Sequence, residues 1–212
     1  MSTSENVSKS AVKRGRPFGS NAEDTRERLL QAAGRQFNEN AYADVSMAKV
    51  ARSAGMTGAA IYNYFSSKDE LFEETVTSQI RRYNDTITKA VSGSGSWKDK
   101  FNRLVDAVTP VQRTSYNFPM IGSVVINRLQ QEPDQFQEIR DLRNESAEIF
   151  RSLVVEGVEC GDLPIDTDIA ITGDLLMAIT AGAMNTVSFY HPSLDDMKPI
   201  VDAVKTLLGT RS

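Results

Sequence analysis

Apolar side chains recur at helical spacing along most of this chain. Where they fall at positions i, i+3, i+4 and i+7, the pattern predicts an amphipathic helix, because these positions share one helix face. Four helices are predicted within 20–90, and others at 97–113, from Pro119, from Pro133, at 166–190 and at 194–208. No stretch has the alternation of apolar and polar residues that is typical of a half-buried strand. The sequence therefore predicts an all-α protein.

Residues with strong preferences for helix ends mark several boundaries. The stretch "SNAE", which starts at Ser20, has the Ser-x-x-Glu form of a capping box. Asn40 and Gly55 are expected to end helices in the left-handed conformation. The other expected N-terminal caps are Ser46, Thr57 for a very short third helix, and either Ser66 or Ser67 for the fourth.

The helices and the segments between them divide the chain into four parts. Residues 1–19 are Ser-rich with few large apolar residues, so a disordered basic arm is predicted there. Within 20–67 a short helix, a Gly-containing turn and another short helix complete a three-helix head with the helix-turn-helix arrangement. A connecting helix is expected at 68–90. Because "VSGSGSW" at 91–97 is predicted to be a flexible break, 91–212 is expected to form a separate helical domain.

Composition is that of an ordinary globular chain. Of the 212 residues, 40% are hydrophobic and 25% charged, which suffices for a sizeable core. No apolar run reaches the roughly 20 residues of a membrane span, and the polar N-terminus lacks the apolar core of a signal peptide. Cys160 is the only cysteine, as is typical of a reducing interior. We therefore expect a cytoplasmic protein.

Charge is distributed unevenly along the chain. The net charge of −4 argues by itself against nucleic acid. Residues 1–82, however, hold 12 Lys and Arg against 10 Asp and Glu, a net of +2, and residues 83–212 hold 12 against 18, a net of −6. A basic N-terminal part on an acidic body can bind a polyanion locally.

The residues that usually carry catalysis are scarce. His191 is the only histidine and precedes Pro192 at an expected helix end, where a surface or capping role is the simpler interpretation. Cys160 stands in a turn, with no further histidine to activate it. No Gly-rich phosphate loop and no cluster of metal ligands is present in the sequence. We expect no enzyme activity, no cofactor and no metal.

The segment "GMTGAAIYNYF" at 55–65 is the strongest candidate for a binding surface. Small residues in it are followed by aromatic ones, and none is charged. A recognition helix needs small leading residues for close approach to the major groove and polar side chains for bases and phosphates. Ile61 and Phe65 are expected in the core. The candidate DNA contacts are Ser46, Thr57, Gly58, Ala59, Ala60, Tyr62, Asn63, Tyr64 and Lys68.

These candidates have different expected roles. Asn63 can bind adenine through two hydrogen bonds, and Lys68 is expected to reach the phosphate backbone as a point charge. Tyr62 and Tyr64 are expected to offer hydroxyls to phosphates while their rings pack on the preceding helix. The alternative, a structural small-residue helix in a bundle, explains the alanines but not the donors around them.

The stretch "RERLLQAAGRQFNENAYADVSMAKVARSAGMTGAAIYNYFSSKDELF" resembles the DNA-binding head of the tetracycline-repressor (TetR) family of bacterial transcriptional regulators. Two positions depart from the family pattern. Ala41 stands where glycine is usual, and Tyr64 stands where histidine is common. The rest of the chain resembles the family only in length and helical character.

The resemblance implies a homodimer, built through the helices at 166–190 and 195–208, that binds a palindromic double-stranded operator. It also implies repression that ends when a small, apolar or amphipathic effector fills a pocket in the C-terminal domain. A ligand-dependent activator and a helical ligand-binding protein without a DNA role remain alternatives. The pocket candidates are Leu104, Val108, Tyr116, Phe118, Met120, Val124, Phe150, Met177 and Met184.

The residues themselves support the dimer and an additional DNA contact. The helix at 166–190 is apolar around much of its circumference, more than one core face needs, although a fully buried helix in a monomer would look the same. "RGRP" at 14–17 has the form of an AT-hook core, in which Arg14 and Arg16 can enter a narrow minor groove. A basic tail that only raises solubility is the alternative for this arm.

Overall fold

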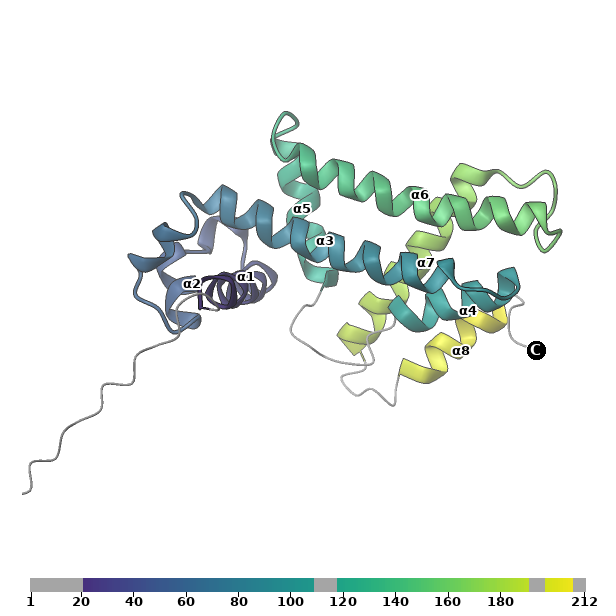
Figure 1. Ribbon diagram of the computed structural model, residues 1–212, viewed down its shortest axis with the longest axis horizontal. Coiled ribbons are helices and arrows are strands. Elements are labelled where there is room, and N and C mark those ends of the chain that lie inside the picture. Colours follow the sequence, from purple (N-terminus) through teal and green to yellow (C-terminus); the bar gives the residue numbers. More distant parts are fainter. Residues whose placement is uncertain (1–20, 109–117, 191–196, 208–212) are drawn as a thin grey trace, which may run out of the picture.

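The computed structural model describes residues 21–108, 118–190 and 197–207, and within these ranges the chain forms helices and connections only (Figure 1). The all-α prediction is confirmed. No helix in the described part of the chain is long and apolar enough to span a membrane. The elements, with η for 3₁₀ helices, are α1 (Asn21–Glu39), η1 (Tyr42–Asp44), α2 (Met47–Ser53), η2 (Ala60–Asn63), α3 (Lys68–Ser92), α4 (Trp97–Val108), α5 (Phe118–Gln131), α6 (Gln137–Glu159), α7 (Ile169–Tyr190) and α8 (Met197–Leu207).

Among the helix ends predicted in the N-terminal part, those at Gly55 and Ser67 are confirmed. Gly55 is left-handed, with φ 76°, and Ser67 caps α3 by accepting a hydrogen bond from the Glu70 amide at 3.1 Å. The prediction of a left-handed Asn40 is wrong, because its side chain supplies the helix end instead. Asn40 Nδ2 donates to the Gln36 carbonyl at 2.9 Å, which satisfies a carbonyl of the last turn. Ser20 lies outside the described residues.

Two helices of the C-terminal part begin later than predicted. The helix expected from Pro133 begins at Gln137, because Phe136 before it is left-handed, with φ 59°. This conformation costs free energy in a residue other than glycine, and here it accompanies a Phe136 ring that is 6% exposed. The helix expected from residue 166 begins at Ile169, where the Asp168 carboxylate accepts a hydrogen bond from the Ile171 amide at 2.9 Å.

The segment 91–97, predicted to be a flexible break, is a short capped connection. Ser96 and Asp99 form a capping box, in which the Asp99 amide donates to Ser96 Oγ at 3.2 Å and the Ser96 amide to the Asp99 carboxylate at 2.9 Å. Arg103 donates to the carbonyls of Ala90 and Gly93 and so satisfies the end of α3. The connection therefore joins α3 and α4 within one packed unit.

The buried apolar residues form two clusters, and α3 belongs to both. The first, which we call the head core, joins α1, α2, η2 and the first half of α3 to one side of α5 and the start of α6. The second, the body core, joins the end of α3 to α4, α6, α7 and α8. Figure 1 shows α3 running from the head on the left to the body on the right, with α6 alongside it.

An aromatic cluster in the head core fixes the start of α3. Phe72 is fully buried, and its ring meets those of Phe37, Tyr42 and Phe136 edge-on, at centroid distances of 5.1, 5.3 and 5.6 Å. These residues come from α1, η1 and the N-cap of α6. Edge-to-face aromatic pairs add to the stabilisation that burial gives. Phe72 therefore holds the head against the body as well as α3 against α1.

Replacing Phe72 with alanine is expected to reduce the free energy of unfolding by about 3–5 kcal/mol, because a large cavity remains. For a chain of this size, this corresponds to a midpoint lower by roughly 6–20 °C. Thermal unfolding followed by circular dichroism measures the change. Tyr62→Ala is the matched control, because Tyr62 is 58% exposed, and it should change stability by no more than about 0.5 kcal/mol. Equal effects of the two substitutions would contradict this description of the head core.

Candidate DNA-binding surface and effector cavity

The segment 57–64, which we call the recognition turn, follows α2 through a tight connection. The Met56 amide donates to the Ala51 carbonyl at 2.9 Å, and Gly55 supplies the left-handed residue that this turn requires. At Gly58, a Cβ atom would lie 3.1 Å from Ala48 Cβ. Gly58 therefore allows the recognition turn to pack closely on α2. The lack of a side chain at Gly58 makes room for this contact with α2. The prediction from the sequence is instead that it allows a close approach to DNA.

The recognition turn has a buried side and an exposed side. Ile61 and Phe65 are 0% and 1% exposed within the head core, as predicted. Tyr62 lies 58% exposed, and the side chains of Asn63 and Thr57 are exposed as well. The described residues thus leave this polar face uncovered, while the apolar face anchors it.

The local conformation differs from the predicted helix. In place of the short helix expected from Thr57, the chain forms a single four-residue 3₁₀ helix, η2. Its N-cap residue is Ala59, and Thr57 makes no cap hydrogen bond to it. Short 3₁₀ segments are typical where a chain must turn back into a core after a few residues, as this one does at Phe65. Ser46 occupies the N-cap position of α2, but its exposed hydroxyl makes no cap bond.

The two tyrosines of the turn lie in different environments. Tyr64 is half-buried and packs against the head core, which fits the predicted packing of its ring. Tyr62 is 58% exposed, so less of it is covered by the head than of Tyr64. Ala59 is exposed, whereas Ala60 and Gly58 are half-buried. The exposed side of the turn is therefore formed by Thr57, Ala59, Tyr62 and Asn63.

Lys68, predicted to reach the phosphate backbone of DNA, binds the backbone of its own chain in the structure. Its ammonium donates hydrogen bonds to the carbonyls of Tyr42 and Val45 at 3.0 and 3.2 Å, and to that of Ala43 at 3.4 Å. It also lies 4.4 Å from the centroid of the Tyr42 ring, a cation–π contact. An ammonium has three donors, and here all three bind the backbone around η1. Lys68 thus fixes η1 to the start of α3, and a phosphate contact would have to replace one of these bonds.

A second polar contact joins the head to α5. The Arg128 guanidinium lies 2.9 Å from the Asp69 carboxylate and 2.7 Å from that of Glu132, and its side chain is only 12% exposed. It stacks 4.2 Å from the centroid of the Tyr42 ring, and the Tyr42 hydroxyl donates to Asp69. Burial, followed by the hydrogen bond to Asp69, raises the pKa of Tyr42 above its ordinary range. This cluster links α5 to the first turn of α3.

Two exposed cations on α2 were not among the predicted DNA contacts. Lys49 and Arg52 lie on the side of α2 opposite the buried Val50 and Ala51. The two residues are three positions apart in the sequence, so they share one helix face, and the apolar Val50 and Ala51 between them lie on the opposite face. This pattern could have predicted that both cations face the solvent. The predicted contacts Arg14 and Arg16 lie outside the described residues.

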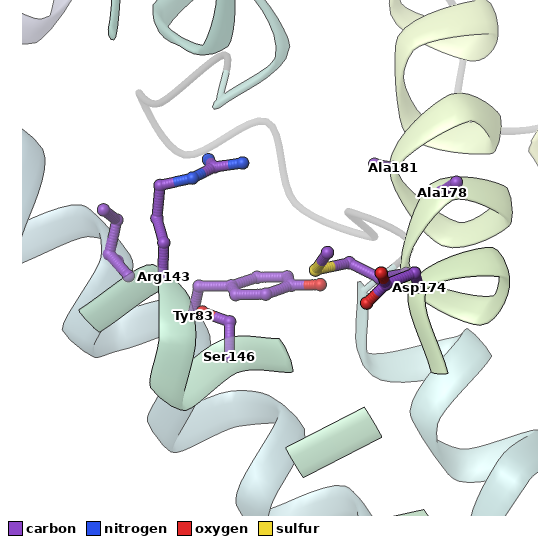
Figure 2. Close-up of a pocket in the computed structure, with 8 residues that line it drawn as sticks. Tyr83, Arg143, Ser146, Asp174, Ala178 and Ala181 are labelled. Carbon is purple, nitrogen blue, oxygen red and sulfur yellow. The ribbon is translucent and has the colours of Figure 1, made fainter. Parts of the chain in front are cut away.

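A cavity of about 220 Å³ lies between α3, α6 and α7. Figure 2 shows the hydroxyl end of Tyr83 directed toward α7 and the side chain of Arg143 extending from α6. The apolar residues that line the cavity are Ile80, Met177, Ala178 and Ala181, and the polar ones are Tyr83, Arg143, Ser146 and Asp174. Burial raises the pKa of Tyr83 to about 12, so its hydroxyl is protonated at neutral pH.

The predicted pocket residues agree only in part with this cavity. Met177 lines it. Leu104, Val108 and Phe150 are buried in the body core instead, because large apolar side chains on these helices fill the interior between α4 and α6. Val124 packs against the head core. The remaining candidates lie outside what the structure describes: Tyr116 entirely, and the side chains of Phe118, Met120 and Met184.

Comparison with known proteins identifies the fold and its head. A sequence profile described as "Bacterial regulatory proteins, tetR family" matches residues 29–75, which span the second half of α1, η1, α2, the recognition turn and the first turns of α3. The head of this chain is therefore that of the TetR family. It is 23% identical over 175 residues to the HTH-type transcriptional regulator SrpR of Pseudomonas putida, a match that covers 80% of this chain and 78% of the relative.

Solved structures share the fold of this chain along nearly its whole length. The fatty acid degradation regulator FadR from Bacillus halodurans superposes with a TM-score of 0.72 at 17% identity, over 87% of this chain and 94% of that one. FadR from Bacillus subtilis, in complex with stearoyl-CoA, gives a TM-score of 0.65 at 17% identity, over 86% and 96%. SrpR is a transcriptional regulator, and residues 29–75 of this chain match the DNA-binding head of such regulators.

The contacts of Lys68 predict a structural role that can be measured without DNA. Lys68→Met removes the ammonium and leaves the carbonyls around η1 without their donor, which should cost about 1–3 kcal/mol in the free energy of unfolding. Urea denaturation followed by circular dichroism measures this value. Lys49→Met is the matched control, because Lys49 is exposed on α2 and makes no contact of this kind among the described residues. A Lys68→Met protein as stable as the control would show that these bonds contribute nothing.

Proposed function

We propose that this protein is a homodimeric repressor that binds a palindromic operator and is released from it by a small effector. The observation that carries the DNA-binding part is the recognition turn, whose polar side is exposed while its apolar side is anchored in the head core. A surface of this kind, with small and hydrogen-bonding side chains, suits the major groove. A regulator that binds chromosomal operators works in the cytoplasm, so this location is part of the proposal.

The residues with the strongest support as DNA contacts are those that the fold leaves exposed. We assign base contacts to Asn63 and Ala59, and contacts to phosphates to Ser46, Thr57 and Tyr62. The exposed Lys49 and Arg52 add charge to this surface. We further propose that Arg14 and Arg16 of the N-terminal arm extend the contact into the adjacent minor groove.

The exposed side of α7 supports the homodimer. Ile171 and Leu175 are 68% and 54% exposed in the single chain, and Gly182 is exposed on the same face. Ile171 and Leu175 are one helix turn apart and offer apolar surface to a partner. Gly182, which has no side chain, lets a second helix approach closely. This exposure speaks against the alternative of a fully buried helix in a monomer. We assign the interface to α7 together with α8.

The cavity between α3, α6 and α7 is the proposed effector site. Two of its residues, Ile80 and Tyr83, lie on α3, and the same helix begins at Lys68 and Asp69 beside η1. An effector that favours one position of α3 therefore also favours one position of the head. A difference in affinity of about 1–3 kcal/mol between the two positions weakens DNA binding roughly 5–150-fold. The complex of FadR with stearoyl-CoA supports an acyl-type effector for a protein of this fold.

Selection of bound duplexes from a random pool should enrich a palindrome with half-sites one helical turn apart, roughly 34–36 Å. On that duplex, Asn63→Ala should raise the dissociation constant about 5–150-fold, because a bidentate base contact is worth about 1–3 kcal/mol. Asn144→Ala is the matched control, since Asn144 is exposed on α6. Fluorescence anisotropy measures both. No enriched sequence would favour a ligand-binding protein without a DNA role.

The proposed interface makes a separate prediction. Leu175→Glu places a charge in the centre of the apolar face of α7, so the variant should sediment as a monomer at micromolar concentration, where the unmodified chain sediments as a dimer. Ile126→Glu is the control, because Ile126 is 46% exposed on α5, a helix outside the proposed interface. A Leu175→Glu protein that remains dimeric would exclude α7 from the interface.

A further inference from the structure

The polar groups that line the cavity differ in what they already bind. Ser146 Oγ donates to Asn84 Oδ1 and to the Leu142 carbonyl, so its proton is used within the α3–α6 contact. The Asp174 carboxylate lies 3.2 Å from the guanidinium of Arg151, which offsets its charge. The hydroxyl of Tyr83 is hydrogen-bonded to Thr180. Three of the four polar residues are therefore already occupied.

Arg143 is the exception among these polar residues. It is half-buried on α6, and it makes no ion pair or hydrogen bond with any residue that the structure describes. Its charge lies close enough to Tyr83 to act on the hydroxyl: burial raises the pKa of Tyr83, while Thr180 and then Arg143 lower it. Within the part of the chain that the structure describes, the cavity therefore contains one positive charge without a partner, beside a neutral phenol.

A partly desolvated guanidinium without a partner is unfavourable, and an anion that binds it recovers this free energy. Arginine suits a carboxylate in particular, because its planar donors match the two carboxylate oxygens. A cationic ligand would be repelled by Arg143 and would find Asp174 already paired with Arg151. The charges around the cavity thus select an anion.

The size and the apolar lining restrict the ligand further. At about 220 Å³, the cavity is smaller than the roughly 300–1,000 Å³ of pockets for drug-sized ligands. Met177, Ala178 and Ile80 form an apolar wall, and a methionine side chain adapts to the shape of a flexible chain. The site therefore suits a short apolar chain that carries a single anionic group.

We propose that the cavity binds a small amphipathic monocarboxylate, with the carboxylate on the guanidinium of Arg143 and the apolar chain against Met177, Ala178 and Ile80. This assignment rests on the proposed function in that it makes the same cavity the effector site, and it adds the chemical class of the effector. Arg143 lies on α6 between residues of the head core and residues of the body core, Ile139 and Phe150. A ligand held by Arg143 therefore acts on a helix that reaches the head.

The test uses three probes of equal chain length and different charge, octanoate, octanol and octylamine. Each is titrated into the full chain by isothermal titration calorimetry in the absence of DNA. Octanoate should bind at least tenfold more tightly than octanol, and octylamine should bind least. Equal affinities for octanoate and octanol, or no octanoate binding at millimolar concentration, would overturn the proposal. Because no DNA is present, the result stands apart from whether the chain represses.

Variants then locate the carboxylate. Arg143→Gln should weaken octanoate binding roughly 10–100-fold, because hydrogen bonds to a charged group are lost, and should leave octanol binding unchanged. Arg143→Lys should have an intermediate effect, since it keeps the charge but not the paired donors. The control is Arg35→Gln, which removes an exposed charge on α1 and should bind octanoate like the unmodified chain. Unchanged octanoate affinity in Arg143→Gln would overturn the assignment, and the three probes decide it should that variant fail to fold.

Discussion

The shared use of α3 by two cores is the constraint on which the rest of the structure depends. Its first turns are buried by α1, α2 and η2, and its last turns by α4 and α6. Phe72 and Ile87, both fully buried, mark the two ends of this burial. Because a packed interior resists small displacements, the head cannot shift relative to the body unless α3 or its contacts shift too. This property is what a regulator with a distant effector site requires.

Polar contacts also hold the start of α3 in place. Lys68 binds the backbone around η1, and Arg128 brings α5 to Asp69 and Tyr42. Both groups are charged and largely shielded from water, so their hydrogen bonds are stronger than those of exposed pairs. They hold the segment before α2 in place from two directions. The recognition turn itself is anchored by Ile61 and Phe65, which leaves its other side facing outward.

The features that follow from local chemistry could be predicted from the sequence. The left-handed Gly55, the Ser67 cap and the buried Ile61 and Phe65 each depend on neighbouring residues and on periodicity, and the structure has all of them. The features that could not be predicted depend on residues far apart. The carbonyls that bind Lys68 precede it by more than twenty positions, and the unpaired charge of Arg143 becomes visible only once α3, α6 and α7 meet. For the same reason, the pocket candidates Leu104, Val108 and Phe150 are buried in the body core. Helical periodicity shows that a side chain faces inward, but not whether it packs in the core or lines a cavity.

We propose that the exposed side of the recognition turn is the surface that contacts DNA. Hydrogen–deuterium exchange tests it directly, with the full chain measured alone and bound to its selected operator duplex. In the complex, the amides within 57–64 and at the start of α2 should exchange more slowly, and those of α4 should exchange at an unchanged rate. Unchanged exchange at 57–64 in a saturated complex, with protection confined to other elements, would contradict it.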